Sequence, residues 1–207
     1  MKTESAEQNL ELIRTLMERS AIYRRALAPM MLWTGGLALV AAFVGWGWRG
    51  MESHMGDRQF IGFWVVACAV ALAGAMFLAR RQAMRDREPF WSPPLRRVAQ
   101  SVVPVGLVAA VWTAHVFQGA EAGLTDLPDK CVVVWSVLYG VALHAAGMFA
   151  PRTLRRAGWC FIGMGVFIGL FGGEINCSPN LWMGWVFGLL HLAGAGYLFA
   201  TEKKHER

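Results

Sequence analysis

Two histidines lie deep within long apolar stretches of the sequence, His144 and His191. Imidazole can transfer protons near neutral pH and can bind metals or haem iron. If both stretches are helices, the two residues differ in depth by only about 4.5 Å at 1.5 Å per residue. Two histidines at similar depth on separate helices are the minimum for bis-histidine binding of haem b. The competing interpretation, which the sequence favours, is neutral histidines that hydrogen-bond between helices.

A third histidine, His115, lies only three residues from the end of its apolar stretch. This different depth argues against one metal site shared by all three histidines. Glu174 follows two glycines at the predicted outer rim of the membrane. Glu174 and His115 are the one acid–base pair that the sequence suggests, and they are candidates for binding at the outer face.

Four cysteines are present, and two of them, Cys131 and Cys177, fall on the same predicted side of the membrane. That side is the outer one, where disulfides persist. We therefore hypothesise a Cys131–Cys177 disulfide, with two unpaired thiols at the interface as the alternative. The sequence has no closely spaced Cys/His motif, which disfavours a structural zinc site.

Catalytic sequence motifs are also missing: there is no nucleophile elbow, phosphate-binding loop or zinc-protease motif. The chain is 56% hydrophobic and only 16% charged. The basic residues flank apolar stretches and do not interleave with exposed aromatic residues, so nucleic-acid binding is disfavoured. We expect a protein that is not an enzyme, without a catalytic or metal site.

The elements that must position these residues are six stretches without any Asp, Glu, Lys or Arg. About 20 apolar residues suffice for a helix to cross a bilayer. The six stretches are Ala28–Trp48, Phe60–Ala79, Val98–Gln118, Cys131–Ala150, Ala157–Gly173 and Leu181–Ala200. They predict an all-α integral membrane protein with a six-helix transmembrane domain over residues 28–200 and a tail over residues 201–207.

Glycines recur at helical spacing in the last two stretches, with Gly158, Gly165, Gly169 and Gly172 near one face of the fifth and Gly184 and Gly188 in the sixth. Small residues at this spacing let helix backbones approach each other closely in lipid. We expect them to pack helices within one chain rather than to form a dimer interface.

Basic residues divide unequally between alternate connections, with seventeen of the twenty Lys and Arg on one side of the predicted topology. Because positively charged loops remain in the cytoplasm, both termini are predicted to be cytoplasmic. The corresponding location is the plasma (inner) membrane. The same residues are expected to attract anionic lipids on the cytoplasmic side.

Residues 1–27 have the pattern of an amphipathic helix. Ser5 and Gln8 fit a capping box, and Leu10, Ile13 and Met17 follow at helical spacing. Such a helix lies on a membrane surface or docks onto a protein partner.

The leading functional hypothesis is therefore a non-enzymatic accessory, sensor or interaction subunit that docks through residues 1–27. A haem-binding electron carrier that uses His144 and His191 is one alternative. A passive channel or facilitator for a small solute is another, because charged residues that would drive transport are missing from the spans.

The disulfide hypothesis predicts that reduction exposes two additional thiols. Labelling of the unfolded protein with a maleimide should increase by two groups after reduction, and Cys131→Ser should abolish that increase. Cys68→Ser is the matched control and should leave the increase intact. Equal labelling before and after reduction would exclude the disulfide.

Overall fold

The computed structural model describes residues 27–47, 56–87, 90–91, 93–120, 126–150, 152–175 and 177–205. The amphipathic helix expected over residues 1–27 lies outside the described residues, apart from Leu27. The end of the predicted tail, residues 206–207, also lies outside them.

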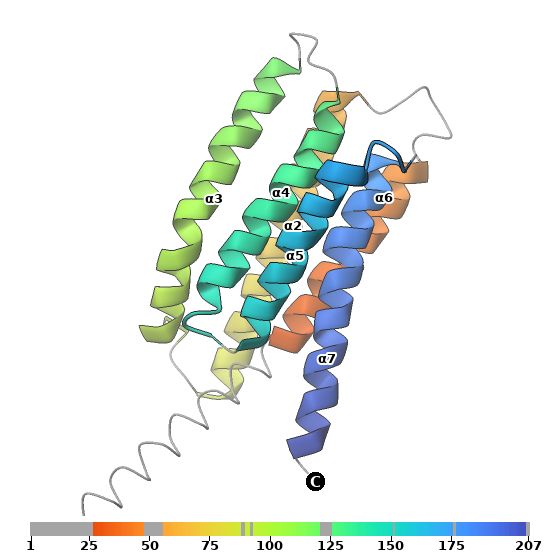
Figure 1. The fold of residues 1–207 in the computed structure, drawn as a ribbon. Coiled ribbons are helices and arrows are strands. Elements are labelled where there is room, and N and C mark those ends of the chain that lie inside the picture. The colour runs from red at the N-terminus through yellow and green to blue at the C-terminus, as the bar shows by residue number, and fades with distance from the viewer. Residues whose placement is uncertain are drawn as a thin grey trace, which may run out of the picture.

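Six helices in the described part are long and apolar enough to cross a membrane (Figure 1). The first five are Leu27–Gly47, α2 (Asp57–Arg85), α3 (Pro93–Gly119), α4 (Leu127–Ala146) and α5 (Arg152–Phe171). The sixth is continuous but changes its winding, from α6 (Pro179–Met183) through the π-helix η1 (Gly184–Leu189) to α7 (Leu190–His205). No strand occurs among the described residues. The predicted all-α architecture with six spans is confirmed.

The helix ends differ from the ends of the charge-free stretches. α2 continues through three arginines to Arg85 rather than ending at residue 79, because long basic side chains reach the headgroups from the last turns of a helix. α4 ends at Ala146, four residues before the predicted end. The N–H of Gly147 bonds to the Leu143 carbonyl at 2.9 Å and closes the last turn.

Two helix pairs approach each other at glycines. Between α4 and α5, a Cβ added to Gly158 would lie 2.7 Å from the carbonyl oxygen of Gly140. Between the first and sixth helices, a Cβ on Gly35 would lie 2.9 Å from the Gly188 oxygen. A Cβ on Gly184, also in the sixth helix, would lie 2.6 Å from the Cβ of Ala42 in the first. The predicted close packing within one chain is confirmed for Gly158, Gly165, Gly184 and Gly188. It is wrong for Gly172, where an added Cβ would meet Ile168 of the same helix, and Gly169 meets only the side chain of Val133 at 3.4 Å.

The buried core connects all six helices, but mainly at one end of the bundle. Its buried members include Phe60 and Trp64 of α2, Val116 of α3, Leu127 of α4 and Trp182 of α6. All of these lie near the helix ends that face away from the α2–α3 connection. Below this core, a second cluster joins only the first and last helices.

We call the end that holds the α2–α3 and α4–α5 connections the basic end. Nine arginines lie there, within or next to the helix termini: Arg80, Arg81, Arg85, Arg87, Arg96, Arg97, Arg152, Arg155 and Arg156. The described part of the chain starts and finishes at the same end, as expected for an even number of spans (Figure 1).

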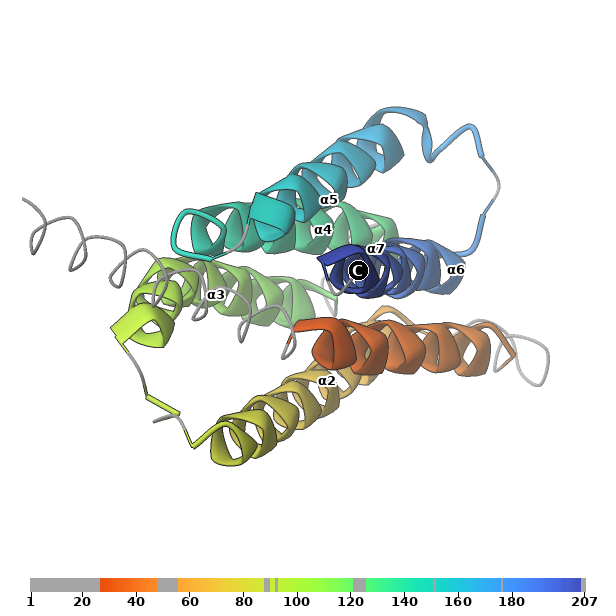
Figure 2. The same ribbon diagram turned by 90° about the horizontal axis from the view of Figure 1, so that it is seen from below.

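The α2 and α3 helices contribute little to the core. Only 11% of the apolar window of α2 and 6% of that of α3 is buried, compared with 28% or more in each of the other four helices. From Val65 to Arg85, α2 has no buried residue. Seen from below, α2 and α3 lie along the outside of the bundle, with α2 beside the first helix and α3 beside α4 (Figure 2).

The glycine contact between α4 and α5 can be tested by adding one methyl group. Gly158→Ala places a Cβ 2.7 Å from backbone atoms of Gly140 and His144, which cannot rotate away. We expect the variant to be less stable by about 1–3 kcal/mol, the usual effect of overpacking. Thermal unfolding of the purified protein in detergent measures the loss.

Gly163→Ala, on the same helix, is the control, because its Cβ would meet nothing within 4 Å. This variant should unfold at the wild-type temperature. Equal losses in the two variants would contradict the packing role of Gly158.

Candidate functional site

His191 is the most deeply buried of the histidines whose burial the structure describes, with 2% of its surface exposed. It lies on α7 just after the π-helix, and its Nδ1 is 2.7 Å from the carbonyl oxygen of Phe187. Because a carbonyl can only accept, Nδ1 carries the proton and donates. The Tyr139 hydroxyl lies 2.7 Å from Nε2 and donates to its lone pair. This pattern assigns a neutral imidazole with one defined tautomer.

Aromatic rings enclose the Tyr139–His191 pair. The Phe161 ring lies 5.1 Å from the His191 ring, edge to face. Phe187 lies 5.4 Å from the Tyr139 ring. The group therefore brings together α4, α5 and the sixth helix at one point. Phe187 belongs to η1, and single π-helical turns often occur at functional sites in proteins.

The chemistry open to His191 is limited by its partners. An Nδ1–H bonded to a carbonyl is the arrangement that orients many ligand histidines. Here, however, Nε2 already accepts the Tyr139 proton, so an iron or another metal would have to displace that hydroxyl. In the observed arrangement the pair connects α4 to α7 by a hydrogen bond across helices.

His144 lies in different surroundings. Its ring is 5.2 Å from the ring of Trp159 on α5, and among the described residues its buried Nδ1 has no hydrogen-bond partner. Tyr139 and His144 are five residues apart on α4, so their side chains leave the helix about 140° apart. The structure thus does not bring His144 to the Tyr139–His191 pair. The haem b hypothesis gains no support from this geometry and stays a prediction.

A second buried polar group joins three helices near the opposite end of the bundle. The Trp64 indole N–H donates to Asn180 Oδ1 at 2.8 Å, and Asn180 Nδ2 donates to the Gly45 carbonyl at 3.0 Å. Indole can only donate and a carbonyl can only accept, so the amide orientation is fixed. Asn180 is 4% exposed, and it was not identified from the sequence. A single amide at the start of an apolar stretch was the available signal.

Aromatic side chains fill the bundle at the same end. The Trp135 indole donates to the Thr113 hydroxyl at 2.9 Å, which joins α4 to α3. Its ring also stacks on Phe60 of α2 at 6.3 Å. A path for a solute through the bundle would have to cross this layer. The passive-channel hypothesis stays a prediction and gains no support here.

The predicted disulfide residues both belong to the region of the core at the opposite end. Cys131 is fully buried at the start of α4, with a thiol that is not oxidised. Cys177 precedes α6 and is half-buried against the same cluster. No Cys131–Cys177 bond is present in the described structure, and the pairing stays a prediction because thiol oxidation depends on redox conditions.

The predicted acid–base pair is not brought together. His115 is exposed on α3, and Glu174 is exposed in the turn after α5. α4 lies between these two helices (Figure 2). A joint role of Glu174 and His115 at the outer face therefore has no geometric support and stays a prediction. The described residues also contain no group of three His, Cys, Asp or Glu that could hold a metal ion.

Six helices of spanning length and apolar composition place the chain in the class of multi-pass helical membrane proteins. Comparison with protein-family models, with curated proteins and with solved structures finds no match.

The hydrogen bond between Tyr139 and His191 predicts a measurable loss when the hydroxyl is removed. Tyr139→Phe leaves the buried Nε2 without a donor, which should lower stability by about 0.5–2 kcal/mol. Thermal unfolding in detergent tests this. Tyr197→Phe removes the hydroxyl of an exposed tyrosine on the same bundle and should have no effect. A similar loss in both variants would mean that the His191 contact contributes nothing specific.

Proposed function

We propose that the chain is a non-enzymatic interaction subunit of the plasma (inner) membrane that binds a protein partner. Its basic end and both termini face the cytoplasm in this proposal. The orientation rests on the arginines at the basic end, since basic residues next to spans are retained in the cytoplasm.

The observation that carries the proposal is the surface of α2. Along its length from Val65 to Arg85 no residue is buried, although a helix of a bundle normally buries one stripe along its whole length. Its first turns reach the core through the buried Phe60, Ile61 and Trp64 and the half-buried Ala67. A helix of an intramembrane partner can therefore pack against the exposed side of α2 beyond Ala67 without displacing any contact of that core.

The exposed side of α2 suits such contact because it presents large apolar side chains: Val66, Val70, Leu72, Met76 and Phe77. A partner helix that covers them gains packing contacts, which drive helix association in lipid. The small residues of α2 lie on its other side, which turns toward the bundle: the alanines at every fourth position from Ala67 to Ala83 are half-buried. Gly74, on that side, receives the ring of Trp33 from the first helix.

Residues 1–27 would supply a second contact on the cytoplasmic side. The described chain begins at Leu27, at the basic end of the bundle (Figure 1). A partner that touches both surfaces would bind more tightly than through either alone.

Photo-crosslinking in native membranes tests this proposal. A photoreactive residue is placed at Val70 or Phe77 of α2, and at Val166 or Leu170 of α5 as controls of similar exposure. We expect a discrete adduct with another protein from the α2 positions and none from the α5 positions. Removal of residues 2–25 should reduce the yield of that adduct several-fold.

Two results would overturn the proposal. Adducts only with lipid from all four positions would mean that α2 is a lipid-facing helix without a partner. An adduct at twice the mass of the chain would mean that α2 is a contact between two copies of this chain, and not a site for another protein.

A further inference from the structure

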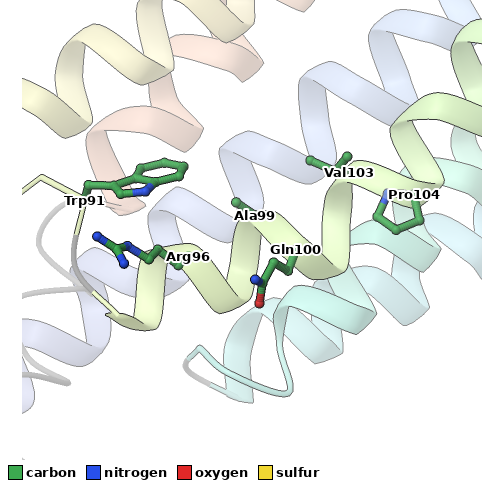
Figure 3. A pocket seen from close by; sticks show the side chains of 6 residues that line it. All are labelled: Trp91, Arg96, Ala99, Gln100, Val103 and Pro104. Carbon is green, nitrogen blue, oxygen red and sulfur yellow. The ribbon is translucent and has the colours of Figure 1, made fainter.

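An open recess lies at the basic end of α3, with a volume of about 490 Å³. Six residues line it: Trp91, Arg96, Ala99, Gln100, Val103 and Pro104. Trp91 and Arg96 lie next to each other at the beginning of the helix, and the other four follow along it (Figure 3). A volume of this size is in the range of sites for small ligands.

Polarity changes along the recess in the direction of the α3 axis. Its first residues offer a guanidinium, an indole N–H and a side-chain amide, whereas Val103 and Pro104 are apolar. Arg96 and Pro104 are eight residues apart, which is about 12 Å along a helix. One end of the recess therefore suits a polar headgroup and the other end suits a hydrocarbon chain.

The polar end is positively charged. Arg96 is exposed, and among the described residues no ion pair is found for it. Asp86, at the other end of the α2–α3 connection, accepts a hydrogen bond from Gln82 at 2.9 Å. Arginine recognises phosphate through parallel N–H donors, and indole adds a further donor at headgroup depth.

The backbone of α3 adds one further polar group. Pro104 has no N–H, so it cannot give the helical hydrogen bond to the carbonyl of Gln100. Both residues line the recess. A hydroxyl of a lipid headgroup, such as that of phosphatidylglycerol, is a suitable donor for this acceptor.

We propose that the recess binds one anionic phospholipid of the leaflet at the basic end, with its phosphate at Arg96 and Trp91. One acyl chain then lies along Val103 and Pro104. The site differs from general attraction of lipid by basic loops, because it assigns the contact to one arginine. It also does not depend on any protein partner.

Retention of lipid by the purified protein tests the proposal. Native mass spectrometry compares wild type with Arg96→Gln after addition of dioleoyl phosphatidylglycerol. Loss of one charged phosphate contact should weaken binding about tenfold. Arg97→Gln is the matched control, since it removes the same charge from the next residue, which is exposed and does not line the recess.

A second variant separates shape from charge. Ala99→Phe fills the recess and keeps every arginine, so it should also abolish selective retention of the lipid. Dioleoyl phosphatidylcholine, with a phosphate but no net charge, should bind wild type at least several-fold more weakly than the anionic lipid.

Three results would overturn the site. Equal losses in Arg96→Gln and Arg97→Gln would show diffuse electrostatic attraction. Full retention in Ala99→Phe would place the lipid elsewhere. Displacement of the lipid by millimolar inorganic phosphate would show that the polar end binds a free anion and that the apolar end contributes nothing.

Discussion

The contact between the backbones of α4 and α5 at Gly140 and Gly158 is the constraint from which much of the fold follows. In lipid, apolar side chains gain little by leaving their surroundings, so helices associate through close packing and hydrogen bonds. A Cβ added to Gly158 would lie 2.7 Å from the backbone of Gly140, so there is no space for a side chain between α4 and α5 at this point. Gly35 and Gly188 set the same condition for the first and sixth helices. The bundle thus contains two closely packed helix pairs.

Polar side chains then connect the pairs to each other and to the remaining helices. Tyr139 and His191 join α4 to α7, and Asn180 joins α6 to Trp64 of α2 and to the first helix. In both groups each buried side-chain nitrogen and oxygen has at least one hydrogen-bond partner, which lowers the cost of polar groups in an apolar interior. Because Asn180 and the aromatic layer lie near the opposite end, α2 is held there and much less at the basic end. The part of α2 without a buried residue accordingly lies toward the basic end.

The sequence predicted the features that depend on one helix at a time. Charge-free stretches identified six spans, since a charged residue inside hydrocarbon is costly. The faces of Gly158, Gly165, Gly184 and Gly188 followed from helical periodicity alone. Features that depend on neighbours could not be obtained in this way. His144 and His191 were compared by depth, but direction around the helix axis decides which residue meets His191, and that residue is Tyr139. Asn180 and Trp64 are 116 positions apart, and only the packing of the helices brings them together.

The arginines at the basic end also show that the number of residues and the position of each residue carry different information. The rule that orients a membrane protein counts basic residues in a connection and is indifferent to their order. For that purpose Arg96 and Arg97 are equivalent, and each contributes one charge. Consecutive residues of a helix point about 100° apart, however, so that only one of the two lines the recess. Topology therefore requires the arginines of this connection collectively, whereas recognition of an individual phosphate requires a particular one. Pro104, further along α3, lines the apolar part of the same recess as Arg96. In the proposed site the arginine therefore acts beside an apolar surface and not as an isolated charge.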